Sequence, residues 1–371
     1  MTDDSKPGDA VDDGKGRVFP CEGCGADLEF HIGQQNLACP YCGFEKPLEF
    51  GEEDASVDEH GFKAMLARMR EHHEQDRHDE SGQSELRCDS CGGTVVFQGS
   101  LTSSECPYCA SPIQLDDVHD AEHRVPMDGV LPFLIERDRA KQNLAAWVRS
   151  RWFAPNEFKK RGVNGRFNGV YEPYWTYDAM TFSRYRGERG EHYWDTVKRG
   201  DQERRVRKTR WWSASGSFDR FFDDILILAS RGLPRNLVRK LEPWPLEKCV
   251  SFTQEALAGF YARTYEVELE EGFQLAREIM DDAIRAEAKR RIGGDEQRVH
   301  SVSTSVSAVT FKHLLLPVWL LAYRYNDRTY QVMVNAATGE VQGERPWSIV
   351  KIMLAVLTAA AIVGGIALLQ R

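Results

Sequence analysis

The chain has 371 residues, of which 42% are apolar and 11% aromatic, so most of it should fold, with room for more than one domain. Its formal net charge of −9 argues against a general nucleic-acid binder, because affinity for phosphate backbones comes from clustered Lys and Arg. The acidic start carries no apolar run, so we expect no signal peptide and a reducing compartment, where paired cysteines bind metal more often than they form disulfides.

The N-terminal part predicts two small zinc ribbons behind an acidic tail (1–17) that we expect to be disordered. Residues 18–50 and 86–115 each contain the pattern C-x2-C-x14-C-x2-C. The eight predicted metal ligands are Cys21, Cys24, Cys39, Cys42, Cys88, Cys91, Cys106 and Cys109. All four cysteines of the first ribbon recur in the second at a constant offset, together with Gly25 as Gly92. This repeat indicates a duplication and supports both sites.

Each cysteine quartet should hold one zinc ion. Two close pairs can meet at one tetrahedral metal, and four thiolates satisfy Zn²⁺ completely; an iron–sulfur cluster is the minor alternative. A closed site has no open coordination position, so it is not a hydrolytic centre. Its expected role is to stabilise a ribbon that is too small to bury a core. Few cations lie in either ribbon, so protein contact is favoured over nucleic acid.

The next elements predict a linker and a larger α+β domain. The linker (51–85) should contain a short amphipathic helix at Phe62–His73. The domain (120–346) should have helices at Arg139–Trp152 and Glu271–Ile292, the second closed by Gly293. Strands are expected in Gly169–Trp212, rich in aromatics, and then at Val299–Phe311, Leu316–Tyr325 and Thr329–Asn335. We expect the sheet to be antiparallel.

A basic stretch within this domain has two interpretations. It could contact an anion, either RNA or acidic lipid headgroups, through Arg204, Arg205, Arg207, Lys208 and Arg210. The alternative, which we favour, is a solvated hairpin with its charges pointing outward.

The C-terminal run at residues 349–369 is almost free of charge and about long enough to cross a bilayer. We therefore expect a transmembrane helix; a buried core helix is the alternative. The expected location is a bacterial inner (cytoplasmic) membrane, single-pass, with most of the protein in the cytosol.

Several strings of the chain are similar to a bacterial family with N-terminal zinc ribbons and a C-terminal membrane helix. These strings are GVYEPYWTYDAMTFSRYRGERG (169–190), RKTRWWSASGSFDRFFDD (207–224) and LPVWLLAYRYNDRTYQVMVNAATGEVQGERPWS (316–348). Members commonly bear the name primosomal protein N′ (replication factor Y), superfamily II helicase. The family also resembles the zinc-ribbon membrane subunit of operons that encode phage-shock-protein-A-like and SPFH-domain proteins. That resemblance implies an adaptor for such partners.

The functional expectation is a membrane-tethered, non-enzymatic scaffold that recruits protein partners. No phosphate loop, G-x-S-x-G or H-E-x-x-H motif is found in the sequence, so the helicase name is not expected to describe an activity. The alternative is a membrane-tethered nucleic-acid-binding protein that uses the basic stretch.

Overall fold

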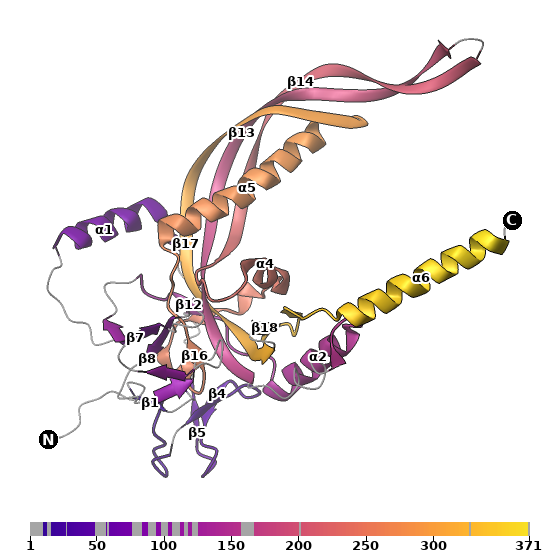
Figure 1. Cartoon of the computed structure of the whole chain (residues 1–371). Coiled ribbons are helices and arrows are strands. Elements are labelled where there is room, and N and C mark those ends of the chain that lie inside the picture. Colours follow the sequence, from indigo (N-terminus) through magenta and orange to yellow (C-terminus); the bar gives the residue numbers. More distant parts are fainter. Residues whose placement is uncertain are drawn as a thin grey trace.

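The centre of the molecule is a curled, mostly antiparallel sheet that forms an open half-barrel (Figure 1). The computed structural model describes residues 10–12, 16–26, 28–48, 57, 59–75, 84–87, 94–97, 103–105, 112–114, 118–120, 125–156, 167–199, 202–325 and 328–369. The main path through the sheet has the strand order β14-β13-β17-β12-β15.

Three long strands dominate the sheet: β13 (Phe167–Arg199), β14 (Gln202–Leu228) and β17 (Glu296–Tyr325). β13 lies in the middle and pairs antiparallel with both others. Shorter strands complete the sheet: β6 (His60–Gly61), β12 (Gly129–Val130), β15 (Val250–Ser251), β16 (Tyr261–Ala262), β18 (Arg328–Asn335) and β19 (Val341–Gly343).

The half of the sheet that lies lower in Figure 1, away from the hairpin end of β13 and β14, is called the lower half. It is buried on both faces, so its sequence is apolar without alternation. Leu315 and Trp319 of β17 pack on one side with Phe133. Leu314 and Leu316 pack on the other side. The separate strands expected at 299–311 and 316–325 are one continuous strand, because the sheet carries on through this doubly buried stretch.

Helix α5 (Leu269–Ile292) covers one face of the upper half (Figure 1). Its buried positions recur every fourth residue, which puts them on one side of the helix: Gly272, Ala276, Met280, Ile284, Ala288 and Ile292. Trp175 Nε1 donates to the carbonyl of Val267 at 2.8 Å, and the Tyr177 hydroxyl donates to the carbonyl of Leu269 at 2.7 Å. These two bonds fix the start of α5 on β13. Gly293 ends the helix with φ +67°.

The long strands bend at a bulge beside Asp178, where the register of β13 shifts against both neighbours. The buried Asp178 carboxylate accepts the backbone N–H of Asp224 at 2.5 Å. Lys312 Nζ lies 2.9 Å from Asp224 Oδ1 and 3.4 Å from Glu59 Oε1. A cluster of charged groups therefore fixes the bend.

The described residues contain five α-helices: α1 (Phe62–Gln75), α2 (Arg137–Ser150), α4 (Arg235–Val238), α5 and α6 (Ile349–Leu369). Short 3-10 turns lie at Arg239–Leu241, Leu246–Lys248 and Gln254–Leu257. α2 buries Ala140, Leu144 and Val148, so the apolar face that predicted it packs in part, whereas Trp152, which was expected on the same face, lies beyond the helix and is exposed.

The C-terminal helix requires a correction. Across the part of the chain that the structure describes, no helix combines the length and the apolar character needed to span a membrane. The first turn of α6 is instead attached to the protein: Lys351 Nζ donates to the Ala154 carbonyl and to Asn156 Oδ1, each at 2.8 Å. The fold class with a transmembrane helix at 349–369 and the single-pass inner-membrane location are therefore wrong.

Beyond Gly190, which pairs with Glu296 at the start of β17, β13 and β14 continue as a two-stranded hairpin. This arm, residues 191–199 and 202–210, projects away from the body of the molecule (Figure 1). It contains the whole predicted basic patch.

The N-terminal segments form small separate sheets. β3 (Glu29–His31), β4 (Asn36–Ala38) and β5 (Glu45–Pro47) make one of them. The others are built from β1 (Ala10–Asp12) and β2 (Gly16–Val18), from β7 (Ser84–Arg87), β8 (Thr94–Phe97) and β11 (Val118–Asp120), and from β9 (Ser103–Glu105) and β10 (Pro112–Gln114). The tail at 1–17, which we expected to be disordered, thus contains β1 and the first two residues of β2, and these strands pair as a hairpin.

Candidate metal centre

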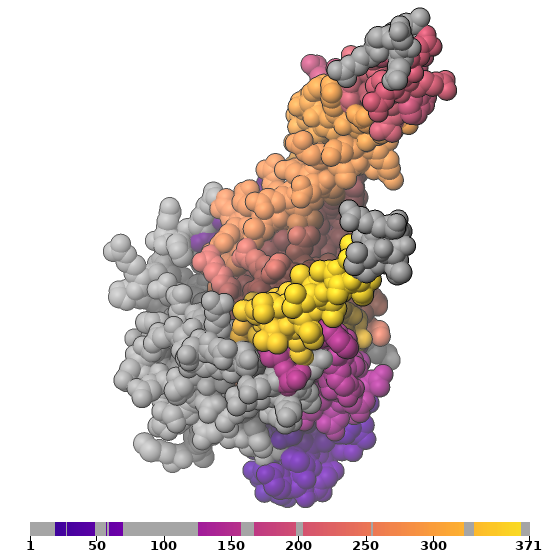
Figure 2. Space-filling model, turned by 45° about the vertical axis from the view of Figure 1, so that its right-hand side comes forward, coloured from indigo at the N-terminus to yellow at the C-terminus, as the bar shows by residue number. Residues whose placement is uncertain are grey.

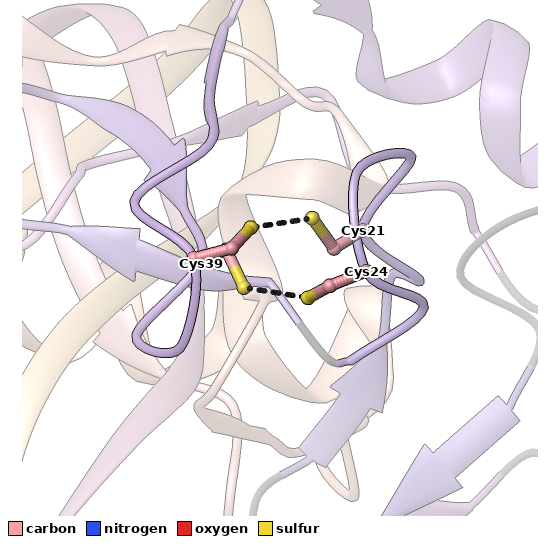
Figure 3. Close-up of side chains that lie close together, drawn as sticks. Cys21, Cys24 and Cys39 are labelled. Atoms are coloured by element: carbon pink, nitrogen blue, oxygen red, sulfur yellow. Dashed lines mark hydrogen bonds between the residues drawn. The ribbon is translucent and has the colours of Figure 1, made fainter.

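The first cysteine quartet comes together as predicted. Cys21 and Cys24 belong to one loop, and Cys39 and Cys42 to the turn between β4 and β5 (Figure 3). Cys21 Sγ lies 3.5 Å from Cys42 Sγ, and Cys24 Sγ lies 3.5 Å from Cys39 Sγ. All four sulfurs lie within 4.8 Å of one another. Zn–S bonds of about 2.3 Å in a tetrahedron separate the sulfurs by about 3.8 Å, so this arrangement fits one zinc ion.

The two loops have the same backbone design. Gly25 N–H donates to the Cys21 carbonyl at 2.8 Å, and Gly43 N–H donates to the Cys39 carbonyl at 3.0 Å. Both glycines have positive φ, +74° and +72°, which a side chain would make costly. Gly43 was not among the predicted residues, although its position directly after the second cysteine of a pair repeats that of Gly25.

The electrostatics of the quartet favour a cation. The backbone N–H of Cys42 donates to the Cys39 sulfur and lowers the pKa of Cys39 to about 7. The Phe44 N–H favours the thiolate of Cys42, but the hydrogen bonds with Cys21 and Cys24 outweigh it and raise the Cys42 pKa to about 12. Sulfurs this close resist simultaneous ionisation unless a cation compensates them. A divalent metal supplies that charge and binds the thiolate form.

The ribbon is packed into the large domain. Its apolar side chains, among them Leu28, Phe30 and the fully buried Leu37, share one cluster with Phe133 and Phe260 of the domain. Gln35 Nε2 donates to the Phe133 carbonyl at 2.9 Å. The rings of Phe30 and Phe260 meet edge to face with centroids 6.2 Å apart. The ribbon that carries the quartet is therefore packed against the end of the main sheet.

The opposite side of the ribbon is exposed. Tyr41, between Cys39 and Cys42, has 75% of its surface open to solvent. Glu22, Pro40, Glu45 and Lys46 of the same ribbon are exposed as well. We call these five residues the knuckle rim. A metal ion bound by all four thiolates would have no open coordination position.

The second quartet, Cys88, Cys91, Cys106 and Cys109, lies outside the described residues. One metal cluster is therefore shown among the described residues, and the second zinc stays a prediction. Strands flank each pair: Cys88 and Cys91 fall between β7 and β8, and Cys106 and Cys109 between β9 and β10. In both cases the two strands pair antiparallel, as β4 and β5 do around Cys39 and Cys42.

The five basic residues do not share one face. They lie on one arm of a regular hairpin, so Arg204, Lys208 and Arg210 point to one side, and Arg205 and Arg207 to the other. All five are exposed. Lys208 Nζ is paired with Asp195 Oδ2 at 2.7 Å, and the Arg210 guanidinium stacks on Tyr193. The single basic face that nucleic-acid binding would require is absent from this segment.

No family model and no solved structure matches the chain. By sequence, the chain is similar to Uncharacterized protein YdjG of Bacillus subtilis (strain 168), with 25% identity over 333 residues. The similarity covers 89% of this chain and 90% of that protein, so it extends over nearly the whole length of both, ribbon and sheet together.

Proposed function

We propose that the chain is a non-enzymatic scaffold whose first zinc ribbon presents the knuckle rim to a protein partner. The observation that carries this proposal is the exposed Tyr41 on a loop whose two ends are both metal ligands. Tyrosine is enriched among residues that dominate protein interfaces, because it gives a large contact area for little conformational entropy. A closed metal centre beneath it supplies rigidity and no reaction.

The chemistry of the rim favours a protein over a nucleic acid. Two exposed carboxylates of the rim, Glu22 and Glu45, would repel phosphate, against one exposed cation, Lys46. We do not propose nucleic-acid binding as a second function, because the arm divides its cations between two faces. SPFH-domain and phage-shock-protein-A-like proteins are the first partners to test, since the family resemblance points to them.

The test is quantitative affinity capture with the zinc-loaded full chain and two variants. Tyr41→Ser removes the exposed ring and leaves all four thiols. Trp152→Ser is the matched control, because Trp152 is 74% exposed at the end of α2 and not part of the rim. Bound zinc, measured by elemental analysis, should be unchanged in both variants.

We expect at least one protein to bind the wild type and the Trp152→Ser variant, and to be reduced tenfold or more by Tyr41→Ser. Chelation of zinc should release the same protein. Partners that bind all three proteins equally would contradict the role of the rim. A catalytic activity abolished by changes in the described domain would contradict the non-enzymatic part.

A further inference from the structure

The first part of β17 forms an open sheet edge. Among the described residues, the ladder of 299–309 has a partner on one side alone, β13. The other neighbours of β17 attach further along: β6 at Thr310 and Phe311, β12 at Leu314 and Leu315, and β18 from Val318 onward. The outer N–H and C=O groups of 299–309 are thus available for another strand.

This edge lacks the usual protection against pairing. Natural edge strands carry Lys, Pro or inward-pointing charges that prevent contact with other chains. Residues 299–309 read VHSVSTSVSAV and include no proline, lysine, arginine, aspartate or glutamate. Alternating valine and serine instead give a strand with strong β propensity and two distinct faces.

The sequence of this edge is a palindrome. Residues 301–307 read Ser-Val-Ser-Thr-Ser-Val-Ser in both directions, and Val299 and Val309 extend the symmetry. The structure has the same symmetry, because the register shifts on both sides of this stretch, opposite Arg186/Gly187 and opposite Asp178/Met180. A regular strand centred on Thr304 is therefore bounded by a bulge at each end.

The side chains suit pairing of two such edges. Val299, Val302, Val306 and Val309 are partly buried against the cluster beneath α5. The serines at 301, 303, 305 and 307 are exposed on the opposite face. In an antiparallel pair centred on Thr304, each Val302 lies opposite Val306 of the second copy, and each Ser303 lies opposite Ser305. The half-exposed valines would then cover one another.

We propose that two copies of this chain associate through antiparallel pairing of residues 301–307, the regular stretch between the two bulges, about a two-fold axis at Thr304. A two-fold axis brings the same surface of both copies together, so it demands a self-complementary surface, and a palindromic strand provides one. A different partner would place no such demand on the sequence. The pairing ends at Ser301 and Ser307, because the register of β17 shifts beyond each of them, and further along Thr310 already pairs with Gly61 of β6. Figure 2 shows the orange part of the chain, which includes the start of β17, open at the surface.

The test uses two double variants that differ only in the substitution at Ser305. Ser303→Lys with Ser305→Lys puts lysine opposite lysine at two places in the dimer, which should break it. Ser303→Lys with Ser305→Glu puts lysine opposite glutamate at the same two places, which should keep it. Both variants change exposed serines on the face away from α5, so each chain should fold, as circular dichroism will check. Mass is measured by sedimentation equilibrium on the full chain.

We expect twice the chain mass for the wild type and for the lysine–glutamate variant, and the single-chain mass for the lysine–lysine variant. Thr304→Cys should also give a covalent dimer under mild oxidation, because residues facing each other across an antiparallel pair lie within disulfide distance. Ser303→Cys, which faces position 305, should not. A monomeric wild type, or a lysine–lysine variant that keeps the dimer mass, would overturn the proposal. The knuckle-rim function does not depend on either result.

Discussion

At the bend of the sheet, one lysine interacts electrostatically with three carboxylates. Lys312 is mostly buried and reaches Asp224 and Glu59 directly. Burial alone would lower the pKa of Lys312, but the carboxylates of Asp224, Asp178 and Glu59 raise it. The Thr310 hydrogen bond, aided by Lys312, lowers the pKa of Glu59, whereas burial raises the pKa of Asp178.

The Lys312→Met substitution keeps an apolar side chain of similar length and removes its charge. We expect a loss of roughly 3 kcal/mol in the free energy of unfolding at pH 7, because the carboxylates are left without their cation. The lowered pKa of Glu59 contributes stability above its unfolded pKa, and that contribution is lost as pH falls through the folded value. Asp178 has a raised pKa, so its ionised carboxylate costs stability at pH values above that pKa. Protonation of Asp178 at lower pH removes this cost. The deficit of the variant should therefore shrink between pH 7 and pH 4 in urea unfolding, because the lowered pKa of Glu59 places its loss below 4.5.

The control is Lys240→Met, at an exposed lysine, which should change stability by less than about 0.5 kcal/mol. A deficit of Lys312→Met that is the same at both pH values would point to lost packing of the side chain and would contradict the charge account.

At the scale of elements, the contact between α5 and β13 depends on one glycine. A Cβ at Gly272 would lie 2.5 Å from the Tyr177 hydroxyl and 2.8 Å from Trp175 Cδ1. Neither ring can move freely, because both donate hydrogen bonds to the chain at the start of α5. Gly272→Ala should therefore destabilise the protein by about 1–3 kcal/mol, although alanine is the better helix former by about 1 kcal/mol.

Gly364→Ala is the matched helical control, since nothing lies within 4 Å of a Cβ at that position. It should leave the thermal midpoint unchanged or raise it slightly. Equal effects of the two substitutions on thermal unfolding would show that helix propensity, and not the close approach to β13, decides the outcome.

Local patterns predicted the elements better than their assembly. The helix expected at Glu271–Ile292 is observed as Leu269–Ile292, because a four-residue repeat and a terminal glycine are local signals. Cysteine spacing was enough to find the first metal centre. The packing of the ribbon on Phe260 could not be predicted, because it joins residues that are far apart in sequence. The continuity of β17 was missed since its lower half is buried on both faces and loses its alternation.

At the scale of the whole molecule, the main sheet is covered by fewer other elements as it runs from the ribbon to the arm. The lower half is covered on both faces, the upper half by α5 on one face, and the arm is a hairpin of two strands. An isolated two-stranded hairpin is marginally stable in water. The arm should therefore open more readily than the rest of the sheet.

Hydrogen exchange measured by mass spectrometry can follow this gradient. We expect amides of the arm to exchange at least tenfold faster than those of residues 170–177 in the same strand, β13, because the latter lie where the sheet is buried on both faces. Residues 170–177 serve as the internal reference. Equal protection along β13 would mean that the arm is held by contacts outside the described chain.

The position of the ribbon also has a consequence for the order in which the protein is made. All four thiols of the first cluster precede the main sheet in the sequence, so they leave the ribosome before it and can bind a metal ion at that stage. Their apolar neighbours Phe30 and Leu37 must wait for Phe133 and then Phe260 before they are covered. During synthesis, a metal ion bound at the quartet would therefore hold the ribbon in shape as a surface on which the later strands of the sheet can pack.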